Sequence, residues 1–558
     1  MIDPASRCAV GSSLSTHEPP TFGCVVEEVG IEPDELPGIT RRQSLQAGGA
    51  VLAALVSPAL LAACGSDKSA TTAALRGPVI LGSGAPPTTF DPQTATDGAL
   101  TTMLPYVYEG LYGVSPKAPY NVIPELAAGE PEQDGNRYRI ALREDAKFHD
   151  GSPVTADDVA ASFERMLNPK TGSLLTPMLS MVKSVKAAGP DALEVIVRAP
   201  TALLKDRLAL VRIIPKSLAG EKGRSKAFET RPVGSGPYRV NSISRDLRTL
   251  RLDRFRGYNG PLKANFATIG ADSFTDPQAR IAALQTKRVH AIIDVPRNAM
   301  AQLSKSPGLS AGSTLSFSAD QILFNCAKKP FDDKRVRQAI LHAIDRKSNI
   351  KTALFGYGEV AASYLPENWK GYKKPATTLE YDPEKARALL AQAGVPKFSF
   401  ELMVANLPSL TPQIPLIQSQ LADVGITSKI RQGETEALYK YVFDGSYSAF
   451  ATVGNASVFG QDPTLLVQWI YVNFAPTGLY WKTPEARRLA SLVQQAQRTA
   501  SADELQSLVG QMQDIIADEC PAFPMYHSKA TAGWSSGLDL KPDPVYTVNF
   551  LQARPAAA

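Results

Sequence analysis

The stretch FHDGSPVTADDV contains four residues of the types that serve acid–base catalysis: His149, Asp150, Asp157 and Asp158. Their spacing also has a structural explanation. Asp150 precedes a glycine in a turn dipeptide, and the later aspartates would lie in the first turn of a helix, where carboxylates favour the positive end of the helix dipole. We therefore favour structural roles for all four.

Other chemical motifs are absent from the sequence. The five histidines are scattered, and neither H-E-x-x-H nor C-x-x-C occurs. There is also no G-x-G-x-x-G or Walker A sequence. PVGSGPYRV places Ser235 between two glycines, but Pro237 would break the helix that must follow a nucleophilic serine, so a tight turn is expected. We predict no catalytic residue, no metal site and no cofactor, and hence no enzyme.

The composition is that of an ordinary globular protein, with 44% hydrophobic and 20% charged residues. A chain of 558 residues exceeds the size at which one core keeps growing, so at least two lobes are expected. The net charge of +5 is small, and no basic run is interleaved with aromatic residues. Nucleic acid is therefore not an expected partner.

Strands and capped helices must position these residues. Short apolar runs such as PVILGS and LEVIVRAP predict strands. Helices are predicted at three segments that begin with a capping residue: 155–167, 382–394 and 501–516. This mixture over a chain of such length indicates an α/β protein of two lobes.

The N-terminal region has the layout of an export signal. Arg41 and Arg42 precede a stretch without charge that runs from residue 43 to residue 66. TRRQSLQ resembles a twin-arginine signal, although Ser44 stands where that family of signals prefers phenylalanine. The general secretory route is the alternative.

Residues 61–64, LAAC, resemble a bacterial lipobox, in which Cys64 is acylated and becomes the first residue of the mature chain. A membrane-spanning helix is the alternative, weakened by Pro58 and by the many alanines. The residues of 64–76 are small and polar and suit a flexible tether. Residues 1–39 are acidic, and they are either a cytosolic extension or the product of a start codon placed too early.

The stretch around the acid–base candidates resembles a family signature. DGNRYRIALREDAKFHDGSPVTADDVAASFER, residues 134–165, closely resembles the family 5 bacterial extracellular solute-binding proteins, the dipeptide- and oligopeptide-binding components of ATP-driven importers. Further segments resemble the family in its own order: PYVYEGLYG (105–113), RPVGSGPYRV (231–240), ILFNCAKKPFDDKRVRQAILHAIDR (322–346), YDPEKARALLAQAG (381–394) and IQSQLADVGITSKI (417–430). The resemblance covers nearly the whole chain from about residue 77 to about residue 530.

The resemblance implies an α/β fold of the periplasmic-binding-protein type, class II-like, with two lobes joined by two hinge strands. The map that it implies is an extension with signal peptide at 1–63, a tether at 64–76, lobe 1 at 77–323 with an inserted subdomain at about 112–214, lobe 2 at 324–520, and a return to lobe 1 with a tail at 521–558. LFNC and ECPAFPM would be the hinge strands. Cys326 and Cys520 would then be neighbours, and a disulfide between them is the resulting hypothesis; two separate buried thiols are the alternative.

The resemblance also implies where the solute binds. Peptide binders of the family hold the peptide ammonium with an aspartate three residues before an Asp-Pro pair, but here Phe459 precedes Asp462-Pro463 at that distance. Either the register is displaced, or the solute lacks an ammonium there, or another carboxylate serves. The implied ligand contacts are Tyr108, Tyr112, Asn325, Trp369, Gly454, Ser457, Phe459 and Asp462, with a place in the core as the alternative for both tyrosines.

The implied function is that of a monomeric receptor on the outer face of the cell membrane. Cys64 would carry the lipid that anchors it, and the permease of an importer would receive the captured solute. A peptide is the first expectation, and sugars, metal chelates and haem-like compounds remain open. A ligand-sensing or regulatory protein on the same fold is the alternative function.

Overall fold

The computed structural model describes residues 77–557 except 85, 88, 96–102, 221–227, 229, 231, 456–461 and 474–477. The chain divides into two units, Met1–Ser69 and Ala70–Ala558, and all described residues belong to the second. The leader, Cys64, the tether at 64–76, Ser457 and Phe459 lie outside the described residues. Within the described part, no helix combines the length and apolar character that crossing a membrane requires.

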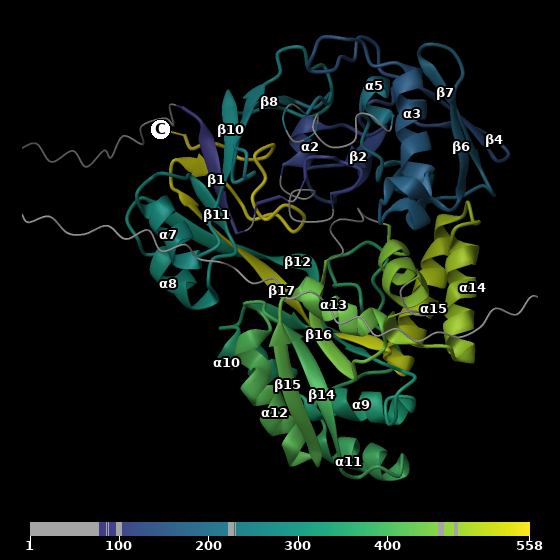
Figure 1. Ribbon diagram of the computed structural model, residues 1–558, viewed down its shortest axis with the longest axis vertical. Helices are drawn as coiled ribbons and strands as arrows, with labels where there is room; N and C mark the ends of the chain where they lie inside the picture. The colour runs from purple at the N-terminus through teal and green to yellow at the C-terminus, as the bar shows by residue number, and fades with distance from the viewer. Residues whose placement is uncertain are drawn as a thin grey trace, which may run out of the picture. The chain divides into compact units, whose positions relative to one another are not determined.

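One mixed sheet of eleven strands forms the frame, in the order β15-β14-β16-β12-β17-β11-β1-β10-β9-β8, with β13 paired to β17. Its centre is a pair of long antiparallel strands, β12 (Leu309–Phe324) and β17 (Ala522–Ser535). Figure 1 shows this pair crossing from the half of the sheet that carries β1 to the half that carries β14. The two halves therefore share a continuous backbone connection through two strands.

The first half of the sheet is buried on both faces. Its strands are β1 (Val79–Ser83), β8 (Tyr238–Ile243), β9 (Thr249–Arg254), β10 (Thr268–Ser273) and β11 (Ala291–Ile293), and its helices are α2 (Leu104–Val107), α7 (Pro277–Gln285), η4 (Arg297–Ala299) and α8 (Met300–Leu303). Val79 and Leu81 of β1 enter one apolar cluster, whereas Ile80 enters another with residues of α7 and α8. Alternate residues of a strand face opposite sides, so a parallel strand covered on both sides reads as a continuous apolar run.

The C-terminal segment packs against this first half. After β17 the chain forms β18 (Leu538–Asp539) and β19 (Arg554–Pro555). Between them, the ring of Phe550 lies tilted beside that of Tyr106, with ring centroids 6.5 Å apart, and the Phe550 backbone N–H donates to the Tyr106 hydroxyl at 3.1 Å.

The second half of the sheet contains β13 (Gly358–Val360), β14 (Phe398–Ala405), β15 (Ile426–Gly433) and β16 (Ala449–Asn455). Its helices are α9 (Lys334–Ala343), α10 (Arg346–Ala353), α11 (Pro383–Gln392), η5 (Thr411–Gln413), α12 (Ile414–Asp423), α13 (Thr435–Phe443), the π-helix η7 (Val467–Asn473), α14 (Pro484–Ala496) and α15 (Ala502–Glu519). Predicted caps are confirmed here: Asp382 accepts from the Lys385 N–H, and Ser501 accepts from the Glu504 N–H.

A separate antiparallel sheet lies within the range expected for the inserted subdomain. It is formed by β4 (Glu132–Asp134), β5 (Arg137–Ala141), β6 (Val182–Ala187) and β7 (Ala192–Val197), and α3 (Ala156–Leu167) packs on it. A hairpin, β2 (Tyr112–Val114) and β3 (Val122–Pro124), and the short helices η1 (Pro169–Thr171), η2 (Thr176–Leu179), α4 (Leu204–Leu208) and α5 (Lys216–Ala219) accompany it. Thr155 and Asp158 form the predicted capping box of α3.

Candidate functional site

The parallel strands of both halves end toward each other. β11 and β12 are both antiparallel to β17, so β1, β10 and β11 run in the direction of β12. β16 is antiparallel to β12, and β14 and β15 run with β16, so these three strands run in the opposite direction. The carboxyl ends of the two half-sheets therefore face one another across β12.

The registers locate this meeting of edges. Ile293, the last residue of β11, pairs with Ala532, which in turn pairs with Gly312 of β12. Asn455, the last residue of β16, pairs with Ser318 of β12. The two edges thus end at the levels of residues 312 and 318 of the same strand. Ligands of open parallel sheets bind outside the carboxyl ends of the strands, so this is the candidate site.

The β12–β17 ladder is irregular at this same level. Leu315 pairs with Lys529 and Ala319 with His527, so that residues 316–318 lie opposite the single residue Ser528. The Ser316 hydroxyl donates to the Ser528 carbonyl at 2.8 Å, which satisfies a backbone acceptor that the bulge releases. Bulges bend a strand and redirect its side chains, so this one suits a hinge between the halves.

Phe317, at the centre of the bulge, lies between two other aromatic side chains. Its ring centroid is 4.3 Å from that of Trp369 in the loop after β13, and 6.2 Å from that of Tyr120 in the hairpin of the inserted region. Phe317 and Trp369 are buried. No described residue accepts a hydrogen bond from the Trp369 indole N–H. Trp369, a predicted contact, therefore does lie beside the hinge.

A buried carboxylate, Asp320, lies on β12 shortly after the bulge. Asp320 of β12 accepts hydrogen bonds from the hydroxyls of Ser409, which follows β14, and Ser528 of β17. Burial raises the pKa of Asp320, and the two hydroxyls lower it in part. The Tyr526 hydroxyl also donates to the Ser409 carbonyl at 3.2 Å. These contacts join the hinge strands to the carboxyl edge of the second half.

Both predicted tyrosine contacts belong to the core. Tyr108 and Tyr112 are completely buried, and their hydroxyls donate to the carbonyls of Phe90 and Gly129. Burial raises the pKa of each phenol. The sequence analysis gave a place in the core as the alternative for both tyrosines, and this alternative matches their surroundings in the structure.

Two further predicted contacts are occupied by intramolecular bonds. Asn325 is buried, and its amide donates to the carbonyls of Gly445 and Tyr447 at 3.2 and 3.1 Å. The Asp462 carboxylate lies 2.6 Å from Arg207 Nε and also accepts two bonds from Thr464, at 2.7 and 2.6 Å. Asp462 thus links the segment before η7 to helix α4 of the inserted region.

Gly454 lies on β16, opposite Ala319. A Cβ at this position would come within 2.8 Å of Nε2 of Gln321, so the glycine leaves room for that side chain beside the hinge strand. Asp206, next to Arg207, was missed by the sequence analysis. Burial, and to a lesser degree the charge of Asp462, raise its pKa to about 6.

The acid–base candidates have structural roles. Gly234 N–H donates to Nδ1 of His149, so Nε2 carries the proton and donates to the Gly236 carbonyl at 3.0 Å. Burial lowers the pKa of His149 to about 4. His149 therefore holds the glycine turn of the PVGSG stretch, and among the described residues no cluster of three His, Cys, Asp or Glu side chains is placed to hold a metal ion.

The two cysteines are free thiols in the structure, so the expected disulfide is absent from it. Cys326 packs in the large apolar cluster that the inserted region and the second half share, whereas Cys520 packs in a small separate cluster with Leu341 and Phe523. Burial raises the pKa of Cys326 to about 11 and that of Cys520 to about 12. Cys326 lies just after β12 and Cys520 just before β17, near enough for Cys326 to raise the pKa of Cys520 in part, but the two sulfur atoms are not bonded.

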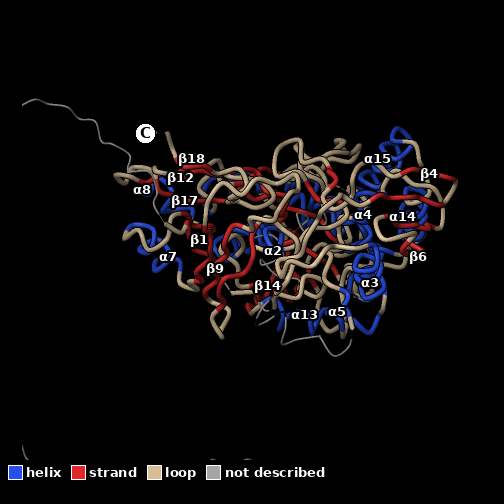
Figure 2. The backbone as a smooth tube through the Cα atoms, turned by 90° about the horizontal axis from the view of Figure 1, so that it is seen from above, coloured by secondary structure: helices blue, strands red, loops and turns tan. Residues whose placement is uncertain are grey.

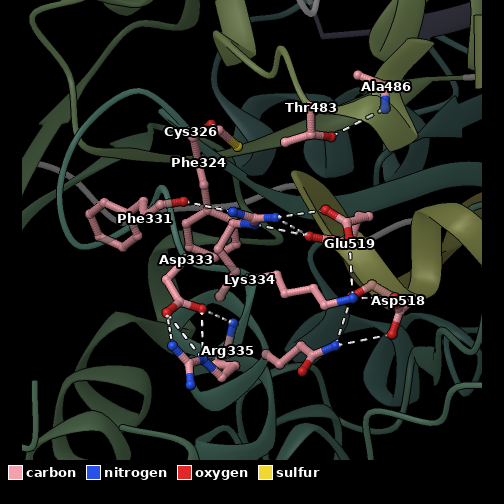
Figure 3. Close-up of polar contacts among 12 residues, drawn as sticks. Phe324, Cys326, Phe331, Asp333, Lys334, Arg335, Thr483, Ala486, Asp518 and Glu519 are labelled. Atoms are coloured by element: carbon pink, nitrogen blue, oxygen red, sulfur yellow. Dashed lines mark hydrogen bonds and ion pairs between the residues drawn. The ribbon is translucent and has the colours of Figure 1, made fainter. Parts of the chain in front are cut away.

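Polar contacts, not a disulfide, fix the ends of the hinge strands in the second half (Figure 3). The buried Arg337 of α9 donates to the Glu519 carbonyl at 2.9 and 2.7 Å and to the Phe331 carbonyl at 2.7 Å. Lys334 lies 2.6 Å from the Asp518 carboxylate. Helix α9 is thereby attached to the end of α15, directly before β17 begins.

Comparison with known proteins agrees with this geometry. The family model described as "Bacterial extracellular solute-binding proteins, family 5 Middle" matches residues 121–474. The glutathione-binding protein GsiB of Shigella dysenteriae is 28% identical over 468 residues, which are 82% of this chain and 91% of GsiB.

Two solved structures share the fold. The periplasmic binding protein DppA of Helicobacter pylori, in complex with the peptide STSA, is 24% identical with a TM-score of 0.75, and the match covers 86% of this chain and 98% of DppA. A dipeptide-binding protein of Pseudoalteromonas, in complex with Met-Leu, is 20% identical with a TM-score of 0.74, with 86% and 100% covered. The predicted α/β fold of the periplasmic-binding-protein type is confirmed.

Proposed function

Because this chain belongs to family 5 of the bacterial extracellular solute-binding proteins, we propose that it captures a peptide or a peptide-like solute and delivers it to the permease of an ATP-driven importer. Membership of this family makes the chain a solute-binding protein and not an enzyme. The observation that carries the proposal is the pair of carboxyl edges that face each other across one bulged strand.

The arrangement explains how capture would work. A solute between the two edges contacts both halves, so it favours the conformation in which the halves approach. β12 and β17 are the two connections, and the bulge at residues 316–318 is where their ladder is interrupted. We place the lobe boundaries as the family resemblance implies, with lobe 1 at 77–323 and lobe 2 at 324–520.

The halves also meet away from the hinge. Arg207 and Asp462 form a buried ion pair, and the Gln468 amide of η7 donates to the Pro177 carbonyl of η2 at 3.0 Å. The views of Figures 1 and 2 agree in placing α14 and α15 next to α3 and β6. We propose that this contact stabilises the approach of the inserted subdomain to lobe 2.

Glutathione and short peptides are the first solutes to test. One relative of this chain is named as a glutathione-binding protein, and two solved structures of similar fold contain a bound peptide. The carboxylate expected at position 459 is replaced by Phe459. Another carboxylate, such as Asp206 beside Asp462, is then required if the solute carries an ammonium group. A solute without that group is the remaining alternative.

We also propose that Cys64 carries a lipid that holds the receptor on the outer face of the cell membrane, after export by the twin-arginine route. The support is the lipobox LAAC, the two arginines before it and the polar tether after it. A single acyl chain binds only marginally, but the two or more chains of a bacterial lipoprotein cysteine give stable anchoring.

Native mass spectrometry of the exported protein tests the proposal. A peptide or glutathione mass on the folded protein, displaced by added glutathione or Met-Leu in calorimetry, would support it. Retention of an unrelated solute that neither compound displaces would refute the peptide class. In a further outcome, the purified protein binds a peptide whose uptake by the cells does not change when the gene for this protein is deleted. That result would indicate the alternative function, ligand sensing.

A further inference from the structure

Arg297 lies at the carboxyl edge of lobe 1, where η4 begins after β11. Its side chain is half-buried, and its Nε is buried without a hydrogen-bond partner. None of the other described residues forms a hydrogen bond or an ion pair with its guanidinium. A buried N–H of a charged group is destabilising until a partner is supplied, so this position favours an acceptor from outside the chain.

Asp294, three residues earlier, is the carboxylate of this edge that is nearest to Arg297 along the chain. Burial raises the pKa of its carboxyl group, and the charges of Arg280 and Arg297 lower it in part. Gly84, directly after β1, borders the same place, because a Cβ there would lie 4.0 Å from Asp294 Oδ2.

The second arginine of this edge uses both of its terminal amino groups to hold the strands, although its Nε, like that of Arg297, has no hydrogen-bond partner among the described residues. Arg280 of α7 is buried, and its guanidinium donates to the Phe274 carbonyl at 2.8 Å and to the Asp294 carbonyl at 2.9 Å. These bonds join the carboxyl ends of β10 and β11. Of these two arginines, Arg297 is the one whose terminal amino groups form no hydrogen bond with a described residue, so its guanidinium is left for a ligand.

Asp320 of the hinge strand β12 does not form an ion pair with Arg297. Asp320 is near enough for Arg297 to lower its pKa in part, but both of its oxygens accept from serine hydroxyls, and no ion pair with Arg297 forms. The charge of the Arg297 guanidinium thus acts on Asp320 in the hinge strand, but the two groups form no hydrogen bond or ion pair.

We propose that Arg297 binds a carboxylate of the solute between the two edges. The planar guanidinium presents paired N–H donors that match the two oxygens of a carboxylate, and a partly desolvated setting strengthens that pairing. This inference rests on the proposed function and deepens it, since it names an anionic group that the solute must carry.

The test is calorimetric binding to the exported protein, freed of co-purified solute by dialysis, with four probes: Met-Leu, Met-Leu amide, glutathione and glutathione diethyl ester. The variants are Arg297→Gln, Arg297→Lys and the control Lys305→Gln, which removes an equal charge from an exposed position after α8. The Arg297 side chain forms no hydrogen bond or ion pair with a described residue that the substitution would break, so the melting temperature of Arg297→Gln should stay within about 2 °C of that of the wild type.

We expect the wild type and Lys305→Gln to bind at least one free acid about 30-fold or more tighter than its amide or ester, and Arg297→Gln to lose that discrimination. Arg297→Lys should retain part of it. Unchanged affinity of Arg297→Gln for the free acid would overturn the inference alone. A wild type that binds none of the four probes would overturn the proposed peptide class together with the inference that rests on it.

Discussion

The guanidinium Nε of Arg207 lies 2.6 Å from Oδ2 of Asp462, and both side chains are completely buried. The two residues are 255 positions apart in the sequence. Arg207 belongs to the inserted region and Asp462 to the segment before η7. One ion pair thus joins the inserted region to the second half, at a place away from the hinge strands that connect the halves.

Loss of either partner should be strongly destabilising. Asp462→Ala leaves the Arg207 charge buried, so the free energy of unfolding should fall by about 3–5 kcal/mol. Urea denaturation measures this, with Arg137→Ala as the control because its pair with Glu194 is exposed. The double variant Arg207→Met, Asp462→Leu should lose much less than the sum of the single losses. Additive losses would contradict a direct interaction.

Acid should destabilise the fold through His149. Its pKa is lowered to about 4 by burial, below the ordinary value near 6.5, so between these values the unfolded chain binds the proton and the folded chain does not. Stability is therefore full above pH 6.5 and falls toward pH 4, by up to about 3 kcal/mol from this group. Denaturant titrations of His149→Gln should show a flatter dependence in this window. Parallel curves for variant and wild type would disprove the assignment.

The glycine turn that His149 holds should tolerate no side chain. A Cβ on Gly234 would lie 2.1 Å from the Val107 carbonyl oxygen, which is backbone and cannot move aside. Gly234→Ala should cost about 1–3 kcal/mol of unfolding free energy. Gly129→Ala is the matched control, because nothing lies within 4 Å of its Cβ. Equal stability of the two variants would show that the turn is not tightly packed.

Cys326 and Cys520 should titrate as two thiols. They are free, buried and in separate apolar clusters, and their raised pKa values leave little thiolate. If Cys64 is lipidated as proposed, the mature protein should therefore show almost no reaction with a thiol reagent when native, and two reactive groups after denaturation without reductant. No reactive group after denaturation would restore the disulfide hypothesis.

Cys64→Ala tests the anchor. If lipid on Cys64 holds the receptor, the variant should appear in the medium or periplasm, whereas the wild type stays with the membrane fraction. Fractionation followed by immunoblotting measures the distribution. A variant that remains in the membrane fraction would favour the spanning helix.

The sequence by itself determined the family, the fold class and the local elements. Capping pairs such as Thr155–Asp158 and Ser501–Glu504 depend on residues three positions apart, so they can be recognised in one dimension. The structural roles of Asp150 and Asp158 also follow from local turn and helix chemistry, whereas His149 acts through bonds to residues more than 80 positions away. The prediction of a solute-binding protein came from the ordered segments that resemble the family, and the family match over residues 121–474 confirms it.

Only the tertiary structure decided which side chains are available to a ligand. Asn325 and Asp462 are polar residues in the expected segments, but partners more than 100 positions away occupy them. Arg297 stands in no recognised motif, and unlike that of Arg280 at the same strand edge its side chain forms no hydrogen bond with a described residue. Strand register and long-range pairing set these differences, because they bring together residues that no local spacing relates.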